Sequence, residues 1–153
     1  MACHCQQDEL YAAEHEVPWT GDSFESIEQV QEWVDRLRES AWWERNFPNV
    51  RKVYVEKHVK GRMDGAGLDD VGHGVVPWWP GWGEMLMLHE VCHVLTDKRF
   101  GNAAHSPWFC RMYLEMVSTY LGPEVYLELQ KAMDRHGVDH DTDNMIPAGR
   151  FQL

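Results

Sequence analysis

Residues 88–95 read LHEVCHVL, an apolar run that contains the pattern H-E-x-x-H and no glycine or proline. Such a run favours a buried helix. Residues four apart lie nearly above one another on a helix, so His89 and His93 can present their imidazoles to one point. Two neutral imidazoles at this spacing suit Zn²⁺, which binds nitrogen at about 2.0–2.1 Å. This stretch therefore predicts a helix that carries two metal ligands.

The acidic residue of the pattern has a different predicted role. Glu90 follows His89 directly, about 100° further round the helix axis. From there its carboxylate can flank the metal without binding it and take a proton from a zinc-bound water. The five letters alone leave an alternative open, a core helix whose two histidines are satisfied by ordinary packing.

A third ligand is available further along the chain. His105 lies twelve residues after His93, beyond the polar, turn-like segment 98–102. Ser106 and Pro107 follow it at once, and Ser as N-cap with Pro in the first helical position is a strong helix start. Three histidines and one open position describe a catalytic zinc site, whereas structural zinc is usually closed by four protein ligands.

The motifs 89–93 (HEVCH) and 104–109 (AHSPWF) together resemble the SprT-like and related minimal zinc metallopeptidases. In that pattern HExxH is followed by a short loop and by His-Gly-Pro-x-Phe, which opens the next helix. The longer run from Tyr11 to Val138 resembles more closely a small family of metallohydrolases from actinobacteria and their phages. Ser106 stands where the pattern usually has Gly, a departure that leaves the ligands intact and bears on the geometry of the turn.

This resemblance implies a role for each site residue. His89, His93 and His105 would be the zinc ligands, and Glu90 would be the catalytic acid and base. It also implies a minimal zincin-like α+β domain, with an N-terminal helix, a short antiparallel sheet, the HExxH helix and two C-terminal helices. The strand at Gly72–Pro77 would be the sheet edge that pairs with an extended substrate.

Composition restricts the class of protein. The 153 residues suit one domain with a real core, and 44% hydrophobic and 12% aromatic residues are typical of folded chains. A net charge of −11 argues against a general nucleic-acid binder, which needs a basic surface. The first five residues do not read as a signal peptide, and no apolar run approaches the ~20 residues that span a membrane. Four unevenly spaced cysteines indicate a reduced, cytoplasmic protein.

We expect the chain to divide into a flexible N-terminal segment (1–21), a domain (22–137) and a C-terminal tail (138–153), and the resemblance implies that this domain is a zincin-like metallohydrolase. Cys3-His4-Cys5 in the first segment gives only a compositional hint of a soft-metal site. In the domain, Asp22-Ser23 is expected to open an amphipathic helix that ends at Trp42-Trp43.

Two or three strands and then three helices are expected after that helix. Alternating residues predict strands at 51–59 and 71–76, separated by a Gly- and Asp-rich loop at 60–70. The apolar periodicity and the caps predict helices at 83–96, 107–121 and 123–136.

Several other side chains have two open interpretations. The cluster Trp78, Trp79 and Trp82 is either a substrate wall or a cap on the core, with at least one ring structural. His58 and His73 are more simply strand residues than ligands, and Cys92 more simply packs as a small hydrophobe. Candidates for outer roles are Asp97 and Glu115 near the ligands and Tyr113 or Tyr120 as transition-state donors.

The sequence therefore predicts a zinc-dependent hydrolase, most simply a peptidase that acts on a peptide or protein. Zn²⁺ held by the three histidines lowers the pKa of its water towards ~7, and Glu90 moves the proton to the leaving amine. Two alternatives remain open: an amidase with a non-peptide substrate, and a zinc-stabilised binding module without catalysis.

Overall fold

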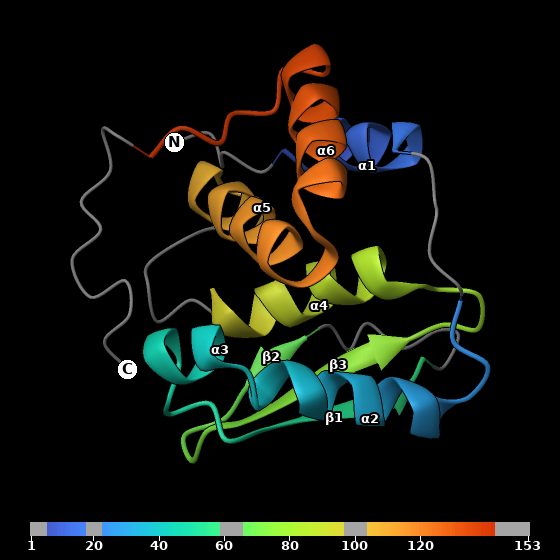
Figure 1. Cartoon of the computed structure of the whole chain (residues 1–153), viewed down its shortest axis with the longest axis vertical. Coiled ribbons are helices and arrows are strands. Elements are labelled where there is room, and N and C mark those ends of the chain that lie inside the picture. Colours follow the sequence, from blue (N-terminus) through green and yellow to red (C-terminus); the bar gives the residue numbers. More distant parts are fainter. Residues whose placement is uncertain (1–5, 18–22, 59–65, 97–103, 143–153) are drawn as a thin grey trace. The chain divides into compact units, whose positions relative to one another are not determined.

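The computed structural model describes residues 6–17, 23–58, 66–96 and 104–142. These residues form an α+β protein, which confirms the predicted class (Figure 1). The elements in chain order are α1 (Gln7–Glu16), α2 (Ile27–Arg38), α3 (Ala41–Asn46), β1 (Lys52–Lys57), β2 (Gly67–Leu68), β3 (His73–Trp78), α4 (Glu84–Leu95), α5 (Pro107–Leu121) and α6 (Pro123–Arg135). They fall into two compact units: a sheet unit, 21–97 with 149–153, and a helical unit, 1–20 with 98–148.

The sheet of the sheet unit is mixed, with strand order β1-β3-β2. β2 is antiparallel to β3, but β1 is parallel to it, so the expectation of an antiparallel sheet was wrong for that pair. The two-residue strand β2 lies between β1 and β3 in the sequence. Because β2 is antiparallel to both of them, the chain reverses direction before β2 and again before β3. A strand this short has no detectable alternation, which is why the sequence shows only a loop there.

β3 is the central strand, so the expectation that Gly72–Pro77 forms the sheet edge was wrong. Every residue of β3 has a register partner in β1, from His73 opposite Lys52 to Trp78 opposite Lys57. On the other side, β2 pairs with Gly74 and Val75.

One face of the sheet is buried, and α4 packs on it. Val53 and Val55 of β1 are buried with Gly74 and Val76 of β3, as the predicted alternation requires. α4 contacts β3 and β2, while α2 runs along β1 (Figure 1). A Cβ atom added at Gly74 would lie 2.7 Å from Cγ1 of Val94 on α4. Glycine is therefore what allows α4 to lie this close to the central strand.

Serine caps divide the first predicted helix into two and move its start. Ser26 accepts a hydrogen bond from the Gln29 N–H at 3.2 Å, so α2 begins at Ile27 and not at Asp22-Ser23. Ser40 accepts one from the Trp43 N–H at 3.3 Å and begins α3. Trp42-Trp43 therefore open a second helix instead of ending the first.

A side chain of α2 covers the backbone edge of β1. Gln31 Nε2 donates to the Val53 carbonyl at 2.8 Å, and Gln31 Oε1 accepts from the Val55 N–H at 2.9 Å. One amide thus satisfies a donor and an acceptor that a neighbouring strand would otherwise satisfy.

In the helical unit, α5 and α6 match their predicted ranges. They are joined at Gly122, whose φ of 98° lies in the region that favours glycine. α1 is an addition to the prediction, because it forms within the segment 1–21 that was expected to be flexible. Glu16 at the end of α1 accepts hydrogen bonds from His136 and from Arg135 of the α6 end, and these lower the pKa of its carboxyl group.

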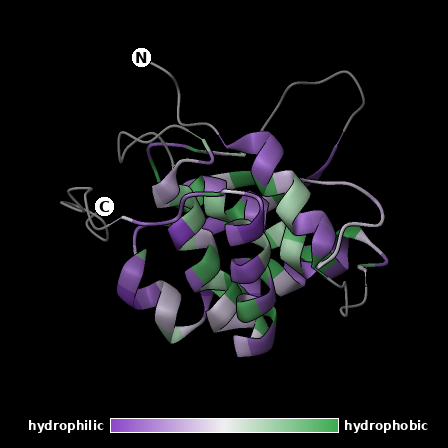
Figure 2. Cartoon of the chain, turned by 90° about the horizontal axis from the view of Figure 1, so that it is seen from above, coloured by the Kyte–Doolittle hydropathy of each residue, from purple (hydrophilic) through white to green (hydrophobic). Residues whose placement is uncertain are grey.

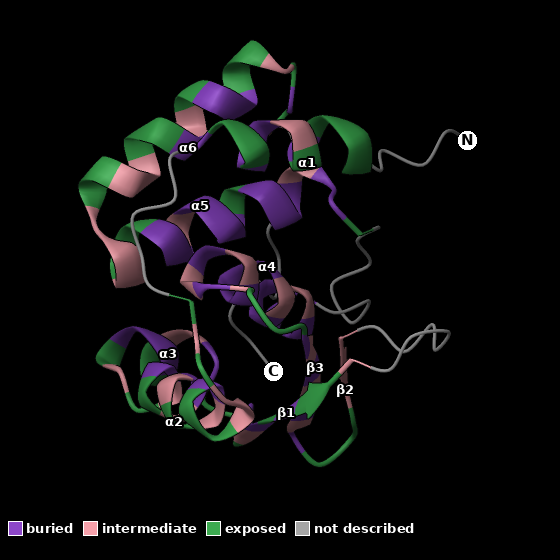
Figure 3. Ribbon diagram, turned by 90° about the vertical axis from the view of Figure 1, so that its right-hand side faces the viewer, coloured by how far each residue is buried: buried purple, intermediate pink, exposed green. Residues whose placement is uncertain are grey.

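The helices carry both apolar and polar residues (Figure 2). α4 and α5 are mostly buried, whereas α6 buries only a narrow stripe (Figure 3). In the part of the chain that the structure describes, no helix has the length and apolar character needed to cross a membrane. Cys3-His4-Cys5, Asp97 and segments 98–102 and 143–153 lie outside the described residues.

Replacing Gly74 tests the close approach of α4 to β3. In Gly74→Ala the new methyl group meets Val94, a β-branched residue with little rotamer freedom in a helix. We expect the free energy of unfolding to fall by about 1–3 kcal/mol, as for other overpacked cores. Gly67→Ala is the matched control, because a Cβ atom there has no neighbour within 4 Å. Urea denaturation that shifts both variants equally would contradict the packing argument.

Candidate metal centre

Two of the predicted ligands lie one turn apart on α4. The ring centroids of His89 and His93 are 5.0 Å apart, and the ring planes meet at 63°. The helix forms as predicted because it carries apolar residues on most faces, and eight of its twelve residues are buried. His89 is one of these, only 3% exposed, whereas His93 is half-buried. A rigid helix in the core thus carries both imidazoles.

The third predicted ligand, His105, lies two residues before α5. It is 4% exposed and has a φ of 58°, the left-handed region that side chains other than glycine rarely adopt. This conformation costs roughly 1–2 kcal/mol and is typical of residues that the surrounding structure holds for a function. Ser106 caps α5 by accepting from the Phe109 N–H at 3.2 Å, as predicted.

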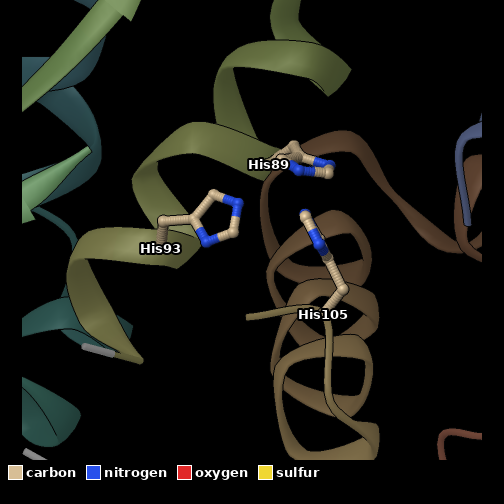
Figure 4. A group of neighbouring side chains, drawn as sticks. All are labelled: His89, His93 and His105. Atoms are coloured by element: carbon tan, nitrogen blue, oxygen red, sulfur yellow. The ribbon is translucent and has the colours of Figure 1, made fainter. Parts of the chain in front are cut away.

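The structure brings all three predicted ligands close together (Figure 4). One ligand nitrogen from each of His89, His93 and His105 lies within 4.8 Å of the other two. Nitrogens around a tetrahedral zinc are roughly 3.3 Å apart, which follows from bonds of about 2.0–2.1 Å. Imidazole ligands of this kind suit Zn²⁺ and its neighbours in the divalent series, so the cluster fits a metal ion without fixing which one.

Glu90 belongs to a partly exposed stripe on the otherwise buried α4. Leu86, Glu90 and His93 follow one another at four and three residues, and all three are half-buried. Their neighbours Met87, Leu88, His89, Val91 and Cys92 are buried. Solvent therefore reaches α4 along the stripe that carries Glu90 and one of the ligands. Cys92 is 0% exposed, as expected of a thiol that packs in the core.

Tyr113 is one of the two predicted transition-state donors, and its hydroxyl group is hydrogen-bonded to Glu14 on α1. Tyr113 is fully buried on α5, and its hydroxyl donates to Oε2 of Glu14 at 2.7 Å. Glu14, on α1, is itself only 7% exposed. Glu14 was not among the residues that the sequence pattern singled out. The signal was available, because Leu10, Ala13 and Val17 share its helical face and are buried.

The tryptophan turn before α4 contains a structural ring, as predicted. Trp78 is 5% exposed, and its Nε1 donates to the Trp82 carbonyl at 3.4 Å. Trp79 is 39% exposed and stacks on His58, with ring centroids 4.0 Å apart and planes at 17°. Trp82 lies beyond Trp79, at 6.3 Å between centroids. His58 is therefore part of an aromatic stack.

His73 and Asp69, both in the sheet unit, have local roles. His73, in β3, makes an edge contact with the Tyr54 ring, with centroids 5.8 Å apart. Oδ1 of Asp69 accepts the N–H groups of His73 and Val71, each at 2.9 Å. The hydrogen bond from the His73 backbone is the main cause of the lowered pKa of Asp69. The Asp69 carboxylate therefore stabilises the turn between β2 and β3 by accepting hydrogen bonds from its backbone.

Searches with the sequence against family models and curated proteins, and with the structure against solved structures, gave no match.

A Tyr113→Phe variant distinguishes a structural hydroxyl from a catalytic one. Loss of the hydroxyl removes a donor from the buried Glu14, so we expect the free energy of unfolding to fall by about 1–3 kcal/mol. The half-buried Tyr126 supplies the control, since Tyr126→Phe should change stability by less than about 0.5 kcal/mol. Unchanged stability of Tyr113→Phe in thermal denaturation would show that the bond to Glu14 contributes nothing.

Proposed function

We propose that His89, His93 and His105 bind one Zn²⁺ and that the protein is a zinc-dependent hydrolase of the minimal HExxH metallopeptidase type. The substrate would be a peptide amide. The observation that carries the proposal is the convergence of three imidazole nitrogens within 4.8 Å, two from α4 and one from the start of α5. The sequence pattern supports it independently, because each ligand lies where the motif places one.

The residues around the cluster divide the chemistry between them. When bound, zinc polarises the scissile carbonyl and makes water acidic enough to lose a proton near neutral pH. The Glu90 carboxylate accepts that proton and returns it to the leaving amine. A general base needs access to both water and substrate, and the half-buried position of Glu90 beside His93 supports this assignment.

The exposure of the stripe also supports an enzyme over a zinc-stabilised binding module. A structural zinc site is closed by a fourth protein ligand and has no use for a base beside it. Here Glu90 and His93 lie on a partly exposed stripe of α4, where substrate could approach. An amidase acting on a non-peptide substrate would use the same groups, so only substrate tests separate it from a peptidase.

The decisive experiment measures metal content and hydrolysis in three proteins. Purified wild type should contain one zinc per chain. His105→Ala should lose most of the zinc, since two ligands remain. Glu90→Gln should retain the zinc and lose hydrolysis of unstructured protein or peptide libraries by at least about 100-fold, the range for loss of a general acid-base group.

Each result bears on a different part of the proposal. Wild-type protein without zinc, folded equally well in the presence of a chelator, would leave His89 and His93 as core residues and remove the enzyme proposal. Zinc in a four-ligand site without exchangeable water would favour the binding module. Undiminished hydrolysis by Glu90→Gln would refute the assigned base, and hydrolysis of small amides alone would favour the amidase.

A further inference from the structure

Gln6, the residue before α1, has a side-chain amide whose orientation is fixed by two backbone groups. Its Oε1 accepts from the Asp139 N–H at 2.6 Å, and its Nε2 donates to the Asp139 carbonyl at 2.8 Å. An N–H group can only donate and a carbonyl can only accept, so the oxygen and nitrogen of this amide cannot be exchanged. Gln6 thereby connects the start of α1 to the segment that follows α6.

The same amide nitrogen reaches the third ligand. Gln6 Nε2 donates to the backbone carbonyl of His105 at 3.2 Å. The Cys110 thiol contacts the same carbonyl oxygen, at 3.8 Å from Sγ. An amide N–H is the stronger donor of the two, because a thiol donates only weakly. Gln6 is thus the stronger of these two side-chain donors to the His105 carbonyl.

The ring of His105 is also held by α1. The Tyr11 ring lies edge-on to the imidazole, with centroids 5.7 Å apart and planes at 75°. Phe109 contacts the imidazole in the same manner, at 5.1 Å and 80°. Two rings therefore restrict rotation of the imidazole, while the bond from Gln6 restricts its backbone.

The backbone conformation of His105 makes such support necessary. Its φ of 58° is one that a histidine rarely adopts, so the residue would relax to an ordinary conformation without restraint. The directions of the carbonyl group and of the Cα–Cβ bond both depend on φ and ψ of this residue. A hydrogen bond that fixes the carbonyl therefore also fixes the direction in which the imidazole leaves the backbone.

We propose that Gln6 is a positioning residue for metal binding, which holds His105 in its left-handed conformation so that the imidazole faces His89 and His93. Tyr11 completes this support from the next turn of the same helix. The inference rests on the proposed metal site and extends it to an N-terminal helix that the HExxH motif does not include. Groups that orient a metal ligand commonly change affinity about 10- to 100-fold when removed.

The test measures metal affinity in folded protein. Co²⁺ is titrated into metal-free wild type, His105→Ala and Gln6→Ala, and the visible absorption of the bound ion reports both affinity and ligand geometry. Competition with a chromophoric chelator gives the dissociation constant for Zn²⁺. In Gln6→Ala we expect the dissociation constant to rise about 10- to 100-fold and the cobalt spectrum to change.

Two control variants separate positioning from general loss of stability. Tyr113→Phe removes a buried hydrogen bond between α5 and α1 without touching the His105 carbonyl. Glu16→Ala removes the contacts of the other end of α1 with Arg135 and His136. Both should leave the cobalt spectrum and the zinc dissociation constant at their wild-type values, whatever they do to the thermal midpoint.

The outcomes distinguish this inference from the function on which it rests. Wild type that binds no metal refutes the metal site itself. Wild type that binds metal, with His105→Ala impaired and Gln6→Ala unimpaired, overturns the positioning role and leaves the site intact. Equal weakening by Gln6→Ala and by the controls also overturns it.

A second variant decides the matter if Gln6→Ala does not fold. Gln6→Glu keeps the side-chain length and an oxygen for the Asp139 N–H but has no donor for the His105 carbonyl. It should weaken metal binding in the same way. Wild-type affinity in Gln6→Glu would overturn the inference.

Discussion

The packing of α4 on the central strand is the constraint on which the sheet unit depends. Gly74 is where that packing is closest, because any side chain there would meet Val94. Val94 is next to His93, so the contact that brings the helix onto the sheet lies directly beside a ligand. Interiors are packed too densely to absorb even one added methyl group without movement. The close packing of α4, which carries the proposed ligands His89 and His93, therefore depends on the absence of a side chain at Gly74.

The position of His105 is determined by specific contacts and not by helical geometry. His89 and His93 gain their relative position from helical geometry alone, since residues four apart on a helix share a face. His105 has no such regular element, and its position comes from specific contacts: a serine cap after it, a positive φ, and the hydrogen bond from Gln6. Strain of this kind persists only where neighbouring groups enforce it. The relative position of His89 and His93 thus follows from one regular helix, whereas the position of His105 depends on contacts with several segments.

The sequence predicted what depends on local pattern and missed what depends on partners. α4, α5, α6 and the three histidines follow from apolar periodicity, caps and a motif, all of which a single stretch reveals. The parallel pairing of β1 with β3 could not be predicted, because it depends on a two-residue strand with no pattern of its own. Ser26 and Ser40 have the same capping chemistry as Ser23, so the sequence alone does not show which serine begins a helix.

The helix α1 was not predicted, because the mostly polar composition of this segment suggested a flexible chain although one face of the helix is buried. Glu14 looks like a surface residue in the sequence, yet it is 7% exposed and bonded to a buried tyrosine. A charged residue is buried only where a partner compensates its lost hydration, and that partner is ninety-nine positions away. The apolar positions Leu10, Ala13 and Val17 are a local signal for α1, but only the distant Tyr113 explains why a glutamate is buried on the same face.

Burial across the ligand set bears on what the cluster can do. A hydrolytic metal site must be dry enough to hold its ligands rigidly and wet enough to admit water and substrate. His89 and His105 are 3% and 4% exposed, whereas His93 and Glu90 are half-buried on one stripe of α4. A purely structural cluster would gain nothing from leaving one ligand and an adjacent carboxylate within reach of solvent. The uneven exposure leaves Glu90, the proposed base, on the more exposed side of α4, and this asymmetry is consistent with the proposed catalytic role.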